Sequence, residues 1–133
     1  MYLFDTNIIT NILKKNPSVT LIGKLKSLPV ENQYISVLTI AEIIYGAYKT
    51  DNPEKHINNL KTILLPQVKV LPFDAKAAYL AGKMQADLEK MGCPLDFVDI
   101  QIAAIAVVND KILITDNQKH FKRISILTTE NWL

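Results

Sequence analysis

The sequence predicts an α/β domain in which a central, mainly parallel β-sheet is flanked by α-helices. Short apolar stretches of strand length alternate along the chain with longer stretches that are apolar at helical period. Strands that alternate with helices are typically joined by crossover connections and therefore run parallel. Hydrophobic residues make up 49% of the 133 residues, which is enough to build a core. We expect residues 1–133 to form a single domain.

The N-terminal half contains two predicted strands and four predicted helices. The strands are 2–4 and 33–36, and the helices are 6–15, 18–28, 39–50 and 53–64. The first helix is expected to end before Pro17, because the residue that precedes a proline disfavours helical backbone. Thr39 to Glu42 fits a capping box, in which a hydroxyl and a carboxylate satisfy backbone donors at the start of a helix.

The C-terminal half continues the alternation. The predicted strands are 68–71, 111–115 and 124–128, and the predicted helices are 74–92 and 97–109. Asp74 is expected to cap the start of its helix, and Gly92 is expected to end it. The helix at 97–109 is apolar almost all round, so it should be buried.

Composition excludes several classes of protein. The net charge is +2, so a nucleic-acid site would have to be local. The single cysteine, Cys93, cannot form an intrachain disulfide and suits a reducing compartment. The start has no basic segment before an apolar stretch, and the longest apolar stretch is far shorter than the roughly 20 residues that span a bilayer. We therefore expect a soluble, cytoplasmic protein without a membrane partner.

Acidic side chains follow several of the predicted strands. Asp5 comes directly after the first strand, and Glu42 lies in the first turn of the helix that follows the second. Asp99 lies in the first turn of the buried helix, and Asp116 and Asn117 come after the strand "KILIT". In open α/β sheets, ligands bind beyond the carboxyl ends of the strands. If the strands are parallel, these side chains converge at one edge of the sheet.

Two interpretations of these acids stay open at this point. Asp5 and Asp96 can be helix caps, which are far commoner than metal sites. Alternatively, the carboxylates form a site for Mg²⁺ or Mn²⁺, which prefer hard oxygen ligands. Asp99 favours the second interpretation, because an unpaired carboxylate on an apolar helix costs free energy. The two interpretations are compatible, since a residue at a cap can also bind a cation.

Five segments resemble the PIN-domain family, in the same order as in that family. They are "DTN" at 5–7, "SVLTIAEIIYG" at 36–46, "PLDFVDIQIAAIA" at 94–106, "ILITDNQKHF" at 112–121 and "ENW" at 130–132. More narrowly, they resemble its VapC branch, the ribonuclease toxins of bacterial toxin–antitoxin pairs. The resemblance covers essentially the whole chain, residues 1–133, as a single PIN-like domain. It implies a PIN fold, an acidic pocket that binds Mg²⁺ or Mn²⁺, and endonucleolytic hydrolysis of RNA by a metal-activated water.

The resemblance also assigns roles to residues of this sequence. The expected catalytic residues are Asp5, Glu42, Asp99 and Asn117. The expected metal ligands are Asp5, Glu42, Asp99 and Asp116. The expected supporting polar residues are Asn7, Ser36, Thr39, Thr115 and Asp96, the last of which is either a further acid at the rim or a cap.

The fourth position of the family pocket often carries Asp, whereas the aligned residue here is Asn117, with Asp116 beside it. Alternate residues of a strand point to the same side. If the backbone stays extended, Thr115 and Asn117 share a side and Asp116 faces away. We therefore expect Asn117 to face the metal site, and a turn directly after Thr115 would bring Asp116 in instead.

Basic side chains near the end of the chain are candidates for contact with the RNA backbone, because phosphate contacts supply much of the affinity in nucleic-acid binding. They are Lys119, His120, Lys122 and Arg123. A solvated surface is the alternative interpretation of this cluster. Lys14 and Lys15, at the end of the first helix, and His56, in a solvated helix, receive no functional role.

The expected partners are an RNA substrate, a cognate antitoxin encoded alongside and a second copy of the chain in a homodimer. Two rival functions fit the sequence less well. A phosphatase with Asp5 as nucleophile would need a second acid two residues later, where Asn7 stands. A catalytically inactive PIN-like module that only binds a partner would not need acids at all three matching positions.

Overall fold

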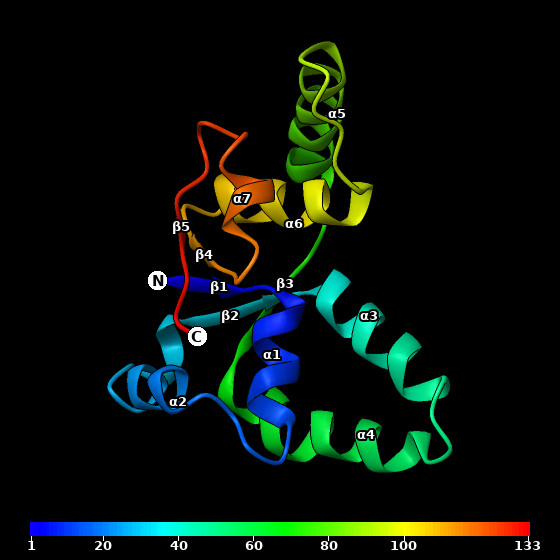
Figure 1. The fold of residues 1–133 in the computed structure, drawn as a ribbon, viewed down its shortest axis with the longest axis vertical. Helices are drawn as coiled ribbons and strands as arrows, with labels where there is room; N and C mark the ends of the chain where they lie inside the picture. Colours follow the sequence, from blue (N-terminus) through cyan, green and yellow to red (C-terminus); the bar gives the residue numbers. More distant parts are fainter.

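The computed structural model describes residues 1 to 133 and contains one parallel β-sheet. Its five strands lie in the order β3-β2-β1-β4-β5, and every neighbouring pair is parallel. The strands are β1 (Tyr2–Phe4), β2 (Gln33–Ser36), β3 (Lys69–Leu71), β4 (Ile112–Ile114) and β5 (Thr129–Glu130). The predicted fold class, a parallel sheet flanked by helices, is confirmed (Figure 1).

Seven α-helices connect and cover the strands. They are α1 (Thr6–Leu13), α2 (Val19–Lys26), α3 (Val37–Tyr48), α4 (Pro53–Asn59), α5 (Ala75–Lys90), α6 (Phe97–Val108) and α7 (Gln118–Phe121). Short 3₁₀ turns lie at Val30–Asn32 and Leu65–Gln67, and a π-helical turn, Leu60–Leu64, continues α4. None of the helices combines the length and apolar composition needed to cross a bilayer.

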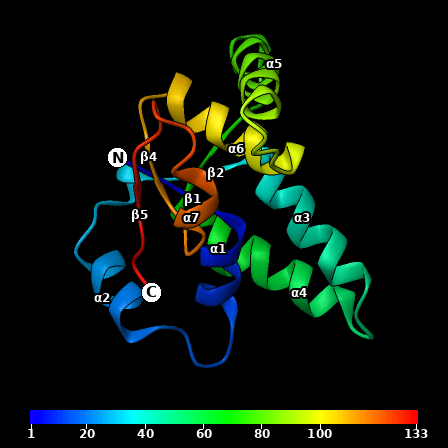
Figure 2. The same ribbon diagram turned by 45° about the horizontal axis from the view of Figure 1, so that its top comes forward.

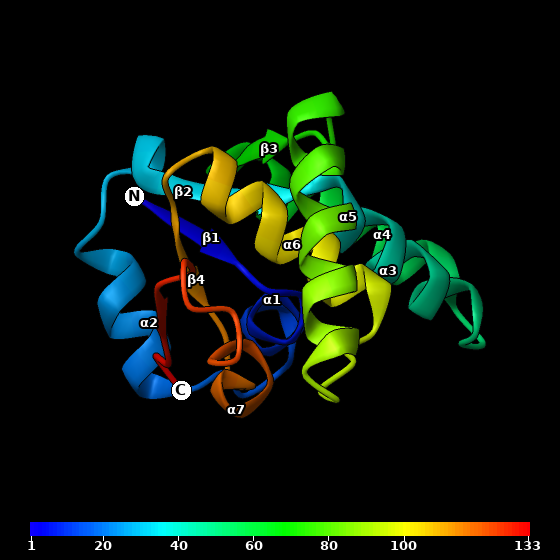
Figure 3. The same cartoon turned by 90° about the horizontal axis from the view of Figure 1, so that it is seen from above.

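The helices cover both faces of the sheet. In Figure 1, α5 and α6 lie on one side of it, and α1, α2 and α4 lie on the other. Seen from above, α5 and α6 lie side by side (Figure 3), and they pack closely against each other. The helices α3 and α4 also pack on each other and extend away from the sheet (Figure 2).

Alternating side chains of the central strands build one hydrophobic core on each face. Leu3 of β1 and Leu113 of β4 join the core beneath α5 and α6, whereas Phe4, Ile35 and Ile114 join the core on the side of α1 and α2. This is the period-two alternation expected of a strand covered on both faces. Six residues of α6 are fully buried, so the prediction of a buried helix is confirmed.

The sequence placed the last strand wrongly. Residues 124–128 form no strand, and β5 is Thr129–Glu130, which pairs with Leu113 and Ile114. Ile124 and Leu127 instead lie in a turn that closes through the Leu127 N–H and the Ile124 carbonyl. The apolar alternation of residues 124–128 does not mark a strand. Ile124 is apolar because it packs into the core beside α7. The short helix α7 was not predicted.

The capping box at Thr39 to Glu42 is also wrong. The helix α3 begins two residues earlier, at Val37, and Ser36 is its N-cap. The Ser36 hydroxyl accepts the Thr39 N–H at 3.2 Å. Glu42 therefore lies in the second turn, and its carboxylate is available for contacts outside α3. By contrast, Asp74 caps α5 as predicted, and Gly92 follows that helix with a positive φ of 70°.

Candidate active site

Asp5 lies where β1 ends and α1 begins, beside the carboxyl end of β4. Its backbone N–H continues the sheet by donating to the Ile114 carbonyl at 2.9 Å. One carboxylate oxygen accepts the Thr6 N–H at 2.8 Å, and the other accepts the Thr115 hydroxyl at 2.8 Å. The side chain is buried, with 6% of its surface exposed. Asp5 is thus an N-cap, as one interpretation predicted, and a fixed, buried carboxylate at the sheet edge.

Thr6 connects Asp5 to the acid carried by α3. Its hydroxyl donates to the Glu42 carboxylate at 2.5 Å and lies 3.1 Å from the Thr39 hydroxyl. Thr39 is fully buried, and it is positioned by the cap that Ser36 provides. Sequence reasoning missed Thr6. The available signal was its place at the first position of α1, directly after Asp5, where a side chain reaches a neighbouring helix.

Asp99 lies half-buried in the first turn of α6, as predicted. Burial raises its pKa first, and the negative charges of Asp5, Asp96 and Glu42 raise it further, whereas His120 lowers it. Together these effects bring the pKa of Asp99 to about 6. Asp96 occupies the N-cap position of α6, but its side chain makes no capping hydrogen bond. The carboxylates from α1, α3 and α6 therefore act on one another across the sheet edge.

Asp116 joins the same cluster. Its carboxylate accepts a hydrogen bond from the Asn7 amide at 3.4 Å. Burial is the main cause that raises the pKa of Asp5, and the charges of Glu42 and Asp116 add to it, while the bonds from Thr115 and Thr6 oppose it. The preference for Asn117 over Asp116 assumed an extended backbone through Asp116, and that assumption does not hold.

The reason is that the extended backbone ends early. The strand β4 stops at Ile114, and the Asn117 N–H turns back to donate to the Thr115 hydroxyl at 3.0 Å. The side-chain alternation that favoured Asn117 does not continue through this turn. The Asn117 amide lies 2.9 Å from Nδ1 of His120 instead. Asn117 thus connects the sheet edge to α7.

The four basic residues expected to bind RNA lie in different parts of the structure. His120 lies at the acids, since it is held by Asn117 and acts on the pKa of Asp99. Arg123 lines a groove with residues of α5, and none of the clustered acids belongs to that groove. Lys119 and Lys122 are exposed and form no ion pair. Of these four residues, the structure brings only His120 into the site.

The arrangement supplies oxygen ligands rather than a closed cage. As the side chains stand, no group of three Asp, Glu, His or Cys residues is close enough to surround a metal ion. Four carboxylates nevertheless meet at one edge, and their charges raise the pKa values of Asp5 and Asp99, as groups of like charge do. Every buried side-chain donor and acceptor has a partner in the chain. The hydrogen bonds of the site are therefore satisfied, but its negative charge is not compensated, and a cation would neutralise it.

The raised pKa of Asp99 has a consequence for stability. In metal-free protein, the folded state binds this proton more tightly than the unfolded chain, so stability falls as the pH rises from 3.8 to about 6. We expect Asp99→Asn to stabilise the metal-free protein by about 1–2 kcal/mol near neutral pH and not below about pH 4, because solvent screens part of the unfavourable interaction at this half-buried side chain. Urea unfolding in the presence of a chelator measures the difference.

Asp87→Asn is the matched control for this experiment. Asp87 is exposed, and its pKa is lowered by its hydrogen bond with Lys83. Removing its charge should therefore not stabilise the protein. Equal stability of wild type and Asp99→Asn at neutral pH would contradict the raised pKa of Asp99, to which burial contributes most and the neighbouring carboxylates contribute further.

Comparison with known proteins identifies the family. The sequence model of the PIN-domain family matches residues 2–127 of this chain. Ribonuclease VapC2 of Haemophilus influenzae is 33% identical over 132 residues, which span 99% of this chain and 98% of the relative. The tRNA(fMet)-specific endonuclease VapC of Shigella flexneri is 32% identical over 131 residues, 98% of this chain and 97% of the relative. The crystal structure of VapBC2 from Rickettsia felis, bound to a DNA fragment from their promoter, superposes with a TM-score of 0.91 at 32% identity and covers 99% of this chain and 98% of that one. The chain therefore belongs to the PIN-domain family, among its VapC members.

Proposed function

We propose that this chain is a metal-dependent endoribonuclease that acts as the toxin of a toxin–antitoxin pair. The observation that carries the proposal is the meeting of Asp5, Glu42, Asp99 and Asp116 at the carboxyl edge of the sheet. The relatives named ribonuclease and endonuclease VapC support the reaction, and the VapBC complex supports the toxin role. A cytoplasmic location, where RNA and a reduced Cys93 coexist, agrees with this function.

The donor set fits Mg²⁺ or Mn²⁺. These cations take carboxylate oxygens and usually keep several waters, so one or two carboxylates suffice to hold them. The site offers no thiolate, and His120 stands at its margin, bonded to Asn117. A bound cation would lower the pKa of a water molecule and stabilise the charge that develops on the phosphate. Burial raises the pKa values of Asp5 and Asp99 most, and the repulsion between the carboxylates, which raises them further, favours such a cation.

Each residue of the cluster has a proposed role. Asp5 and Asp99 are the principal ligands, because their carboxylates are the least hydrated of the set. Thr115 and the Thr6 N–H fix both oxygens of Asp5, so its orientation is set before a cation binds. Glu42, held by the Thr6 hydroxyl, is a ligand or orients the attacking water.

Replacing the principal acids by their amides tests the ligand role. Asn caps a helix about as well as Asp, so Asp5→Asn and Asp99→Asn should fold. We expect both to cut mixed-sequence single-stranded RNA at least about 100-fold more slowly than wild type, because several kcal/mol of transition-state stabilisation are lost. Gel analysis of labelled RNA with Mn²⁺ measures the rates.

Asp74→Asn is the control, since Asp74 is a plain helix cap outside the site. Near wild-type cleavage by both site variants would show that Asp5 and Asp99 are only caps. A wild-type protein that binds neither Mn²⁺ nor RNA would favour the inactive, partner-binding alternative.

A second pair of variants separates the roles of two neighbours. The Asp116 carboxylate accepts a hydrogen bond from Asn7, and its charge adds to the burial that raises the pKa of Asp5. The Asn117 side chain is bonded to His120 instead. We expect Asp116→Ala to raise the Mn²⁺ concentration needed for half-maximal cleavage by about tenfold, since a carboxylate near the cation is lost. Asn117→Ala should leave this concentration unchanged and weaken RNA binding through the released His120. The reverse pattern, measured across a Mn²⁺ series, would restore Asn117 as the residue at the metal.

The proposed antitoxin has a suitable docking surface on the side of α1 that faces α2. There, a groove of about 400 Å³ is lined by thirteen residues, of which ten are hydrophobic, including Ile9, Ile12 and Leu25. An amphipathic helix can lay its apolar face into such a groove. A basic side chain of the antitoxin would reach the neighbouring acids and neutralise them. A homodimer, which the family resemblance implies, belongs to the same proposal.

Ile63 tests this docking surface. It lines the groove and is 53% exposed, so Ile63→Asp should fold while removing apolar contact area. We expect capture of the protein encoded by the neighbouring gene, co-expressed with the toxin, to weaken at least about tenfold. Ile126→Asp is the control, because Ile126 is similarly exposed and lies outside this groove. Equal capture by both variants would exclude the groove as the docking site.

A further inference from the structure

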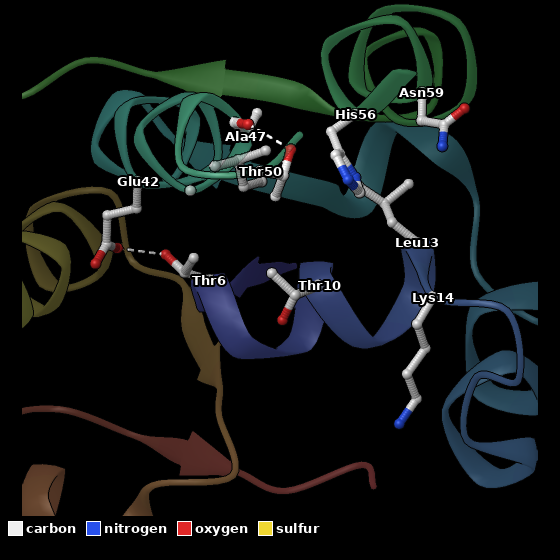
Figure 4. A pocket seen from close by; sticks show the side chains of 11 residues that line it. Thr6, Thr10, Leu13, Lys14, Glu42, Ala47, Thr50, His56 and Asn59 are labelled. Atoms are coloured by element: carbon white, nitrogen blue, oxygen red, sulfur yellow. Dashed lines mark hydrogen bonds between the residues drawn. The ribbon is translucent and has the colours of Figure 1, made fainter. Parts of the chain in front are cut away.

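A second groove starts at the acids and lies between α1, α3 and α4. Its volume is about 320 Å³, and Thr6 and Glu42 form the end at the active site. Figure 4 shows Thr10 and Leu13 of α1 on one side, Ala47 and Thr50 on another, and His56 and Asn59 of α4 closing the far end. Lys14 follows directly after α1 at the same far end. We call this the α1–α3 groove.

Most of the residues that line the α1–α3 groove are not hydrophobic. The hydroxyls of Thr10 and Thr50 are occupied, because they donate to the carbonyls of Asn7 in α1 and Ala47 in α3. The side chains of His56 and Asn59 make no hydrogen bond within the chain. Only three of the eleven lining residues are hydrophobic. Polar side chains without a partner in the chain, such as those of His56 and Asn59, can fix the orientation of a bound ligand.

The two ends of the α1–α3 groove differ in charge. Glu42 is the only carboxylate that lines it, at the end next to Asp5, while Lys14 and His56 lie at the other end. Lys14 lies eight residue steps after Thr6, which corresponds to about 12 Å along a helix. A strand with one phosphate at a cation on the acids would therefore have later phosphates near Lys14.

We infer that the α1–α3 groove holds the single-stranded RNA that continues from the scissile phosphate. Lys14 contacts a phosphate, and the Asn59 amide offers a donor and an acceptor to a base edge or a ribose 2′-hydroxyl. A 2′-hydroxyl that finds an acceptor distinguishes RNA from DNA. This inference rests on the proposed ribonuclease function and adds to it the path of the substrate and the residues that bind it.

A comparison of the two sides of α1 favours RNA over a protein segment as the occupant. The groove toward α2 is lined mainly by hydrophobic residues, as a partner helix requires. The groove toward α3 has free polar side chains and a lysine, and it begins at the proposed site of cleavage. One helix thus presents an apolar face to one groove and a polar face to the other.

Gly46 provides a way to block the groove. It lines the groove on α3, and a Cβ added there meets no atom within 4 Å. Gly46→Met should therefore fold and fill space that RNA would occupy, and it also replaces a poor helix former by a good one. We expect the KM for mixed-sequence single-stranded RNA to rise on the order of tenfold.

Gly82→Met is the matched control. Gly82 lies in α5, is equally free of neighbours within 4 Å and does not line the groove. Its methionine variant should cut RNA like wild type. Hydrolysis of bis(p-nitrophenyl) phosphate with Mn²⁺, a small phosphodiester that needs only the acids, should be the same in wild type and both variants.

Lys14→Gln tests the phosphate contact independently of the blocked volume. We expect weaker RNA binding on all sequences and a salt dependence whose slope is lower by about one, as for the loss of one phosphate contact. Lys15→Gln is the control, because Lys15 is exposed, adjacent and outside the groove. A single-stranded DNA of the same sequence should compete less well than the RNA.

The outcomes separate this inference from the proposed function. If wild type cleaves neither RNA nor the small phosphodiester, the proposed function fails. If wild type cleaves both, and Gly46→Met and Lys14→Gln cut RNA with wild-type KM, the groove does not hold the strand and the inference is overturned. It is overturned equally if Gly46→Met also impairs inhibition by the antitoxin, since the occupant would then be the protein partner.

Discussion

The burial of the Asp5 carboxylate is the constraint on which the rest of the site depends. A carboxylate at the junction of a central strand and a helix loses much of its hydration, which raises its pKa. The chain compensates with two fixed donors, the Thr6 N–H and the Thr115 hydroxyl, which come from α1 and from the end of β4. Because β1 and β4 are neighbours in register, this pair of donors exists only when the sheet is formed.

The same junction organises the elements around it. Thr6, the first residue of α1, ties α1 to α3 through Glu42 and Thr39, so two helices that follow different strands share one polar contact. The α6 helix brings Asp99 to the same edge and supplies six of the fourteen buried residues of the core beneath α5 and α6. The dense packing of α6 therefore fixes Asp99 in place. Rigid elements thus hold the carboxylates, whose mutual repulsion a divalent cation would relieve.

The helix α1 also separates two surfaces of different chemistry. Its apolar side chains, such as Ile9 and Ile12, face the groove toward α2, and its polar ones, Thr6 and Thr10, face the groove toward α3. The acids lie at the start of α1, and Glu42 lines the groove toward α3. A partner whose chain continued from the groove toward α2 to the start of α1 would reach the same carboxylates as a substrate strand in the groove toward α3. This geometry gives inhibition by a protein partner a direct physical route.

The sequence by itself determined the alternation of strands and helices, the parallel sheet, the buried α6 helix and the positions of Asp5, Glu42 and Asp99, because these follow from hydrophobic period and local order along the chain. Local patterns failed where a contact between distant segments decides the outcome. The strand β5 depends on pairing with β4, and α3 begins at Val37 because Ser36 caps it. Likewise, the backbone turns after Ile114 instead of staying extended through Asp116, and Thr6 finds Glu42 only across the fold. Tertiary structure alone decided the pKa of Asp99 and the shape of both grooves, since burial and distance between charges have no counterpart in the order of residues.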